Sequence, residues 1–167
     1  TVLGGSNSKN YMDRLAGAAI NASEGIKALP ELLKAMQDSD SAVRYWGATG
    51  VGNTGQKLVG NTQALHLLNA LLKDSSSTVR TAAARGLCRL NQPGKALPVL
   101  IHELTHGAQW ERLHAAIALD EMDEMARPVA EQMKVGLNYQ KGFNSDGKYR
   151  VRVINRALNE LNGTNNT

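Results

Sequence analysis

The sequence predicts an all-α fold, an α-α superhelix of about four helical hairpins with one additional helix at the N-terminus. Three observations support this prediction. Hydrophobic residues make up 42 % of the chain and aromatic residues only 4 %, so the core must consist of aliphatic side chains that pack helix against helix. The dipeptide Val43-Arg44 recurs as Val79-Arg80 in similar surroundings, which indicates structural repeats. Within these repeats, apolar residues recur at helical spacing.

The first predicted element is a helix near the N-terminus. Residues 9–22 place apolar side chains on one helical face, and we expect residues 1–24 to form a helix that caps the array. The residues on this face are Tyr11, Met12, Leu15, Ala18, Ala19 and Ala22.

Four repeats are predicted after this helix, followed by a flexible tail. Each repeat contains a first helix with apolar residues at helical spacing, a short polar turn and a second helix. Proline recurs at an equivalent position in three first helices (Pro30, Pro98 and Pro128). We expect it in the first turn, where its missing N–H leaves no bond unmade. The predicted boundaries are 25–60, 61–93, 94–125 and 126–162 for the repeats, and 163–167 for the tail.

The second helix of the second repeat has the clearest pattern, because its apolar residues form one continuous stripe along the helix. Small residues at mid-stripe, as at Gly47, Ala83 and Ala115, are expected to let neighbouring helices approach closely. The stripe consists of Val79, Ala82, Ala83, Gly86, Leu87 and Leu90.

Charged residues recur in register with the repeats. An aspartate in the inter-helix turn precedes an arginine in the first turn of the second helix; in the third repeat His106 replaces the acid. Such a pair can form within one repeat or bridge to the next, and the acid can also accept N–H groups where the second helix starts. The alternative is that these arginines bind anions. The predicted ladder consists of Asp38, Arg44, Asp74, Arg80, Arg112, Asp146 and Arg152.

The ladder, the repeat length and the paired helices resemble the HEAT-repeat family over roughly residues 25–162. The resemblance implies a solenoid that presents a surface to a partner. The chain also shows no Ser/His/Asp order, phosphate-binding loop or dinucleotide motif. We therefore expect no catalytic residue, no cofactor and no metal ion in this chain.

A narrower resemblance concerns three segments: Val-Arg-Tyr-Trp-Gly-Ala at 43–48, Arg-Leu-His-Ala-Ala-Ile-Ala-Leu-Asp at 112–120, and Arg-Val-Arg-Val-Ile-Asn-Arg-Ala-Leu-Asn at 150–159. They look like the C-terminal helical-repeat extension of some bacterial sulfatases of the arylsulfatase class. The resemblance implies a preceding domain that hydrolyses sulfate esters with a formylglycine and calcium. It also implies export of the whole protein to the periplasm or the medium.

None of that sulfatase chemistry carries over to this sequence. The formylglycine arises within a Cys/Ser-x-Pro-x-Arg motif, and the residues after Cys88 (Arg-Leu-Asn-Gln) contain neither the proline nor the final arginine. Cys88 is interpreted as a small packed thiol. Because the chain begins at Thr1 without a methionine, we expect it to be a piece of a longer protein.

His102-Glu103-Leu104-Thr105-His106 matches the H-E-x-x-H pattern, in which two histidines hold zinc and the glutamate polarises a bound water. A zinc-dependent hydrolase built on His102, Glu103 and His106 is therefore one hypothesis. The sequence offers no third ligand at the expected spacing and no strand to align a substrate. These residues are better interpreted as the end of an ordinary repeat helix that stops at Gly107.

The preferred hypothesis is a non-catalytic interaction or scaffold domain, the C-terminal part of a sulfatase-like protein. Its partner would be another protein or the catalytic domain that precedes it in the chain. The long polar segment 138–148 is expected on a rim of the solenoid, where such insertions bind partners. The candidate interaction residues are Tyr45, Arg89, Trp110, Phe143 and Tyr149.

A nucleic-acid-binding repeat protein is the alternative from a different functional class. It rests on the formal net charge of +4 and on scattered arginines, although no clustered basic stripe is visible. No apolar run reaches the length of about 20 residues that crosses a bilayer. The arginines in question are Arg85, Arg89, Arg127, Arg150 and Arg156.

Overall fold

The computed structural model describes residues 5–138 and 147–164. Within these ranges the chain consists of helices joined by short turns and contains no strand. The helices in chain order are α1 (Gly5–Glu24), η1 (Gly25–Ala28), α2 (Leu29–Ala35), α3 (Ser41–Thr54), η2 (Gly55–Leu58), α4 (Thr62–Leu71), α5 (Ser77–Arg89), α6 (Pro93–His106), α7 (Gln109–Asp120), η3 (Asp123–Val129), α8 (Ala130–Met133), η4 (Lys134–Leu137) and α9 (Lys148–Leu161), where η marks a 3-10 helix.

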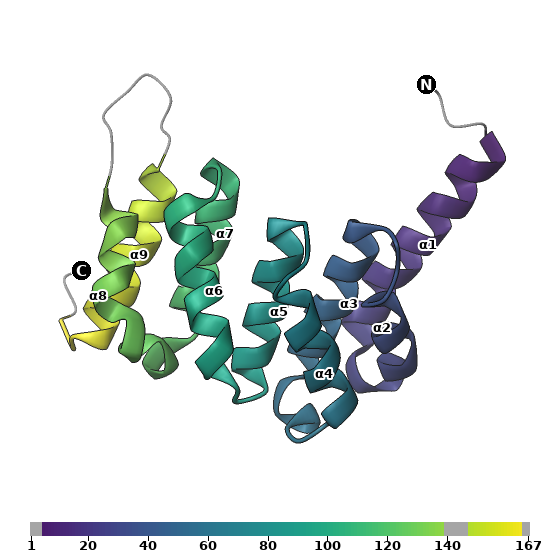
Figure 1. The fold of residues 1–167 in the computed structure, drawn as a ribbon, viewed down its shortest axis with the longest axis horizontal. Coiled ribbons are helices and arrows are strands. Elements are labelled where there is room, and N and C mark those ends of the chain that lie inside the picture. Colours follow the sequence, from purple (N-terminus) through teal and green to yellow (C-terminus); the bar gives the residue numbers. More distant parts are fainter. Residues whose placement is uncertain (1–4, 139–146, 165–167) are drawn as a thin grey trace.

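The hairpins lie beside one another in a single array, from α1 at one end to α8 and α9 at the other (Figure 1). The second helices contact one another in order, α3 with α5, α5 with α7 and α7 with α9, and α1 extends this layer by packing on α3. The first helices α2, α4 and α6 each pack on the second helix of their own hairpin. This architecture confirms the predicted all-α superhelix with an additional N-terminal helix.

One aliphatic core runs through the array. The predicted stripe of α5 is its centre: Val79, Ala83, Leu87 and Leu90 are each at most 1 % exposed. On the other side of this core, Leu32, Leu68 and Leu100 of the first helices are fully buried. Burial of side chains of this size is favourable by about 1.5–3 kcal/mol each, so the core holds neighbouring repeats together.

The N-terminal helix α1 buries only part of its predicted face. Ala18 and Ala22 are buried against the array, whereas Met12 is 56 % exposed. Figure 1 shows the reason, because the first turns of α1 extend beyond α2 and α3. The predicted apolar face of α1 is therefore packed at Ala18 and Ala22 but not at Met12.

Side-chain caps start two of the helices. Asp40 Oδ1 accepts the N–H of Ala42 at 2.8 Å and the more distant N–H of Val43, so it caps α3. Asn61 Oδ1 accepts the N–H of Ala64 at 2.9 Å and caps α4. Each cap satisfies N–H groups that the helix itself leaves without a partner.

The prolines differ from the prediction in two repeats. Pro30 lies in the first turn of α2 as expected. In the third repeat α6 begins earlier, at Pro93, so Pro98 lies inside the helix and removes one bond to a carbonyl of the first turn. In the fourth repeat Pro128 lies inside η3, and the single first helix expected there is divided into η3, the short α8 and η4.

Candidate binding surface

A small groove lies across three consecutive second helices, α3, α5 and α7. Its volume is about 220 Å³, below the 300–1,000 Å³ of sites that enclose a drug-sized ligand. The groove therefore suits one or two side chains of a partner better than a whole cofactor. Hydroxyl groups and two charged residues line it together with short aliphatic side chains. The lining residues are Tyr45, Thr49, Thr78, Thr81, Ala82, Arg85, His114, Ile117, Ala118 and Glu121.

Thr81 contributes a buried hydroxyl to this groove. The residue is 6 % exposed, and its Oγ1 is the one buried side-chain polar atom in the described part of the chain that has no hydrogen-bond partner. A buried hydroxyl without a partner costs about 1–3 kcal/mol.

A charged cluster borders the groove at the end of α7. Glu121 Oε2 accepts from Arg85 Nε at 2.5 Å and from Arg89 Nη2 at 3.0 Å. Arg89 also donates to Asn53 Oδ1 at 3.2 Å, so this arginine joins three consecutive second helices. Its position beside the groove agrees with its choice as an interaction residue, but its charge is already paired with Glu121.

Four of the five predicted interaction residues belong to the described part of the chain, and they lie at two separate places. Tyr45 lines the groove, with its ring edge-to-face on Trp46 at a centroid distance of 5.3 Å, and Arg89 lies beside it. Trp110 and Tyr149, 64 % and 62 % exposed, line a different hollow of about 130 Å³ where α7 and α9 begin. Phe143 lies outside the described residues.

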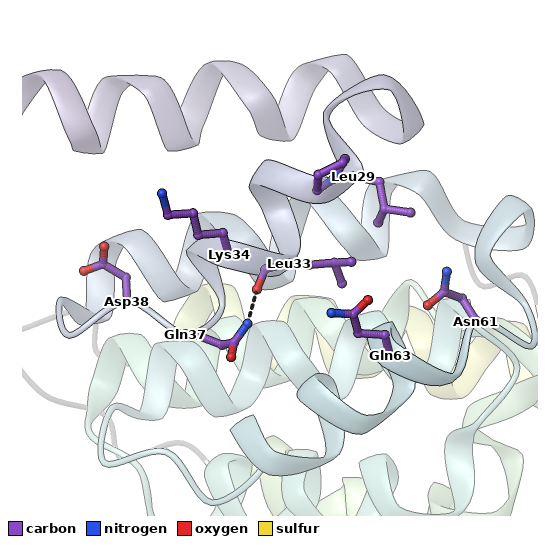
Figure 2. A pocket seen from close by; sticks show the side chains of 8 residues that line it. Leu29, Leu33, Lys34, Gln37, Asp38, Asn61 and Gln63 are labelled. Atoms are coloured by element: carbon purple, nitrogen blue, oxygen red, sulfur yellow. Dashed lines mark hydrogen bonds between the residues drawn. The ribbon is translucent and has the colours of Figure 1, made fainter.

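A wider and more open pocket lies between the first helices α2 and α4, on the other layer of the array. Its volume is about 660 Å³. Figure 2 shows Asp38, Gln37 and Gln63 along it, with the Gln37 amide donating to the Leu33 carbonyl at 3.0 Å. This bond satisfies a donor of Gln37 with a carbonyl of the preceding helix α2, and Lys34 is exposed. The pocket contains no buried polar atom that lacks a partner, within the described residues.

The first rung of the predicted ladder joins two repeats. Arg44 Nε and Nη2 donate to the two carboxylate oxygens of Asp74 in the next repeat, at 2.6 and 2.9 Å. Arg44 Nη1 donates to the backbone carbonyls of Asp38 and Ser39, both at 2.9 Å. The aspartate of the same repeat thus supplies its carbonyl, whereas its carboxylate accepts the N–H of Asp40.

The second rung pairs Arg80 with Glu103, a residue outside the predicted ladder. Arg80 Nη1 again donates to turn carbonyls of its own repeat, those of Asp74 and Ser75. Its Nε donates to Glu103 Oε1 in α6 at 2.7 Å, and the Ser77 hydroxyl donates to Glu103 Oε2 at 2.5 Å. Glu103 is only 2 % exposed and the Arg80 side chain is 24 % exposed, so a buried acid meets a partly buried guanidinium between the second and third repeats.

These contacts change the pKa values of both acids. Burial by itself would raise the pKa of Asp74, but hydrogen bonds from Arg44 and from the Ser76 N–H lower it below its ordinary value. Burial would likewise raise the pKa of Glu103, and the hydrogen bonds from Arg80 and Ser77 lower it. Both acids are therefore held in the charged form.

The remaining rungs follow a different arrangement. Arg112 Nε donates to the Gly107 carbonyl of its own turn at 2.7 Å. Arg152 is exposed, and its predicted partner Asp146 lies outside the described residues. The contact between the last two repeats is made instead by Arg156, which pairs with both carboxylate oxygens of Asp120, with 3.0 Å from Nε to Oδ1. Arg156 lies one helical turn after Arg152, the residue predicted for the ladder. The repeat spacing that defines the predicted ladder therefore does not select Arg156.

The H-E-x-x-H residues occupy different surroundings. Glu103 points into the interface between repeats and is hydrogen-bonded to Arg80 and Ser77, whereas His102 and His106 are exposed on α6. The glutamate is thus not available to polarise a water, which weighs against the hydrolase hypothesis. Among the described residues, no group of three or more His, Cys, Asp or Glu side chains has an arrangement suited to a metal ion.

Cys88 lies on α5 and is fully buried. Burial raises the pKa of its thiol to about 12, so the reactive thiolate form is suppressed at neutral pH. The interpretation as a packed thiol fits this position. None of the helices in the described ranges is both long and apolar enough to cross a membrane.

Comparison with known proteins found a family match for the repeats in the middle of the chain. Residues 64–132 match the family of HEAT repeats. This range extends from α4 to α8 and contains the groove residues of α5 and α7 and the buried pair of Arg80 and Glu103. The match therefore supports HEAT repeats in the middle of the array. The search of curated proteins found no match to the chain.

Proposed function

We propose that this chain is a non-catalytic HEAT-repeat interaction domain that holds a protein partner against its second-helix layer. The observation that carries the proposal is the groove across α3, α5 and α7, which is lined by Tyr45, Thr49 and Arg85 among others. Ile117, 39 % exposed, provides an apolar edge to the same groove. An exposed aliphatic edge among polar and charged side chains is suited to a protein segment.

We further propose that the partner is a sulfatase-like catalytic domain encoded in the same protein and that the repeats stabilise it or shape access to it. The support is the resemblance of the segments at 43–48, 112–120 and 150–159 to the helical-repeat extension of such sulfatases. The first segment contains Tyr45 and the second contains His114, so two of the three contribute to the groove. On this proposal the whole protein is exported.

The test begins with the reading frame that encodes the chain. The region upstream of Thr1 is produced separately and mixed with the chain, and the mixture is analysed by size-exclusion chromatography. We expect an upstream sulfatase domain and co-elution of the two parts. An immediate start codon before Thr1, or separate elution of the two parts, would contradict the proposal.

The arginines on which the nucleic-acid alternative rests are bound to other groups of the chain, and most of them form ion pairs with acids. Arg85 and Arg89 share Glu121, Arg127 pairs with Glu124, and Arg156 pairs with Asp120. Arg150, 8 % exposed, donates to the backbone carbonyls of Gly136 and Asn138. Binding to nucleic acid is driven by cations that neutralise phosphates and release their counterions. An arginine that is already paired with an acid contributes little to this effect.

A further inference from the structure

The two histidines of the H-E-x-x-H segment lie side by side on the exposed surface of α6. Both side chains belong to exposed residues, their ring centroids are 4.6 Å apart, and the ring planes differ by 30°. Residues spaced four apart on a helix occupy the same face, which explains this arrangement. With Glu103 held in the repeat interface, the imidazoles form a pair of their own.

We propose that His102 and His106 form a two-histidine site for a divalent late transition-metal ion such as Cu²⁺ or Zn²⁺. Imidazole nitrogen is a preferred ligand of these ions. The site is independent of the groove on the second-helix layer and of the proposed partner domain. It binds a metal ion without a general base beside it, and so differs from the zinc hydrolase that the motif suggests.

A hydrogen bond of His106 to the backbone leaves the other ring nitrogen, Nε2, available to bind a metal ion. His106 Nδ1 lies 3.2 Å from the backbone carbonyl oxygen of His102. A carbonyl can only accept a hydrogen bond, so Nδ1 carries the proton and Nε2 keeps its lone pair. A backbone hydrogen bond of this kind fixes the tautomer and ring orientation of a metal-binding histidine.

The electrostatic surroundings also favour a cation at this position. His106 is the last residue of α6, and the negative end of a helix dipole stabilises positive charge. The Glu103 carboxylate is close enough to His102 to interact electrostatically with it. A bound ion thus lies at the negative end of the α6 dipole, and the Glu103 charge is already neutralised by Arg80.

Two protein ligands leave the other coordination positions to water, since no larger cluster of His, Cys, Asp or Glu suited to a metal occurs in the described ranges. The site is therefore an open one, in contrast to the closed four-ligand sites that stabilise small zinc domains. The ion is expected to exchange readily. Among divalent ions the affinity should be highest for Cu²⁺ and lower for Ni²⁺ and Zn²⁺.

The test is isothermal titration calorimetry of the chain with CuCl₂, NiCl₂ and ZnCl₂, and with MgCl₂ as an oxygen-preferring control. We expect one transition-metal ion per chain and no heat with Mg²⁺. Either His102→Ala or His106→Ala should weaken binding at least about tenfold, the lower end of what the loss of an outer-shell partner costs. Both positions are exposed and alanine is a good helix former, so both variants should fold.

The matched control is His66→Ala, which removes a single exposed histidine from α4 and should leave binding unchanged. Circular dichroism of each variant verifies the helix content. Absence of binding in the unaltered chain overturns the proposal. Equal binding in the His102→Ala and His106→Ala variants also overturns it, because the ion would then lie elsewhere.

Discussion

Glu103 keeps a negative charge at a position that is almost closed to solvent, and two donors make this favourable. The guanidinium of Arg80 and the hydroxyl of Ser77 each contact one carboxylate oxygen. Arg80 is itself held by the carbonyls of Asp74 and Ser75. A buried charge costs several kcal/mol unless such partners surround it, so the geometry of this site depends on all of its members.

Replacing Arg80 by methionine keeps an apolar stem of similar length but leaves Glu103 without its cation. We expect the free energy of unfolding, measured in urea at pH 7, to fall by about 3 kcal/mol. The control is Arg127→Met, which breaks an exposed pair with Glu124 and should cause no measurable change. An equal effect of the two substitutions would show that burial does not decide the strength of the pair.

The pairing of Glu103 with Arg80 makes the free energy of unfolding depend on pH. Because the pKa of Glu103 is lowered in the folded chain, its contribution is fully present above pH 4.5, the ordinary pKa of glutamate. It is lost as the pH falls through the lowered value in the folded state. The difference between the unaltered chain and the Arg80→Met variant should therefore shrink on acidification, and a constant difference down to pH 3 would argue against a charged Glu103.

Thr81 permits a test of the groove that needs no partner. Replacing it by valine removes the hydroxyl without a hydrogen-bond partner and keeps the shape, so the free energy of unfolding should rise by about 1 kcal/mol. The control is Thr105→Val, which removes a hydroxyl that donates to the Ile101 carbonyl at 2.7 Å and should give no such gain. Destabilisation by Thr81→Val would mean that the hydroxyl is satisfied in the folded chain.

Close contact between helices is set by glycine at a few positions. A Cβ atom on Gly47 of α3 would lie 2.6 Å from the backbone nitrogen of Met36 and 2.9 Å from the carbonyl oxygen of Leu32. A Cβ on Gly52 would lie 3.0 Å from Gly86 Cα in the next second helix. Backbone atoms cannot move aside as a flexible side chain can, so these glycines determine how closely neighbouring helices pack.

The element-scale prediction compares two glycines inside helices. Gly47→Ala should lower the free energy of unfolding by about 1–3 kcal/mol, because it overpacks the contact between α2 and α3. Gly17→Ala in α1, where no atom beyond the local backbone of α1 lies within 4 Å of the added Cβ, should raise it by about 0.5–1 kcal/mol through helix propensity. Thermal or urea unfolding of both variants provides the measurement. Similar effects of the two substitutions would contradict the close approach at Gly47.

The helices themselves could be predicted from sequence wherever an apolar stripe was continuous, as in α5 around Val79 and Leu87. The prediction was wrong where a local signal had two interpretations. Pro98 suggested a helix start, but Pro93 provides one earlier in the chain. Around Pro128 the apolar spacing continues, yet the missing N–H and the ring favour 3-10 turns over a long helix.

Contacts between repeats were harder to predict than the repeats. The pairing of Arg44 with Asp74 remained one of two options, because a recurring acid and base fit either within a repeat or between repeats. Glu103 was assigned to a metal motif by its histidine neighbours, and only the packing of α6 on α5 brings it to Arg80. The groove was not predicted at all, since its residues come from three helices and form no linear motif.

At the scale of the whole molecule, the second helices form one layer from α1 to α9, and the ion pairs join the repeats that this layer brings together. Arg44 with Asp74, Arg80 with Glu103 and Arg156 with Asp120 each cross a repeat boundary. Such an array keeps its surface in a defined shape, because each repeat is fixed by its neighbours. The groove lies across three helices of this layer, where we propose that the partner docks.

The most direct measurement of the proposed partner contact is the binding of the proposed upstream domain, produced separately, to two matched variants of the chain. Thr49→Arg fills the groove of the second-helix layer, and Gln63→Arg adds the same side chain in the pocket between α2 and α4. Circular dichroism verifies that both remain folded. We predict that Thr49→Arg abolishes co-elution and that Gln63→Arg leaves it intact. Loss of co-elution with Gln63→Arg and its retention with Thr49→Arg would contradict the account.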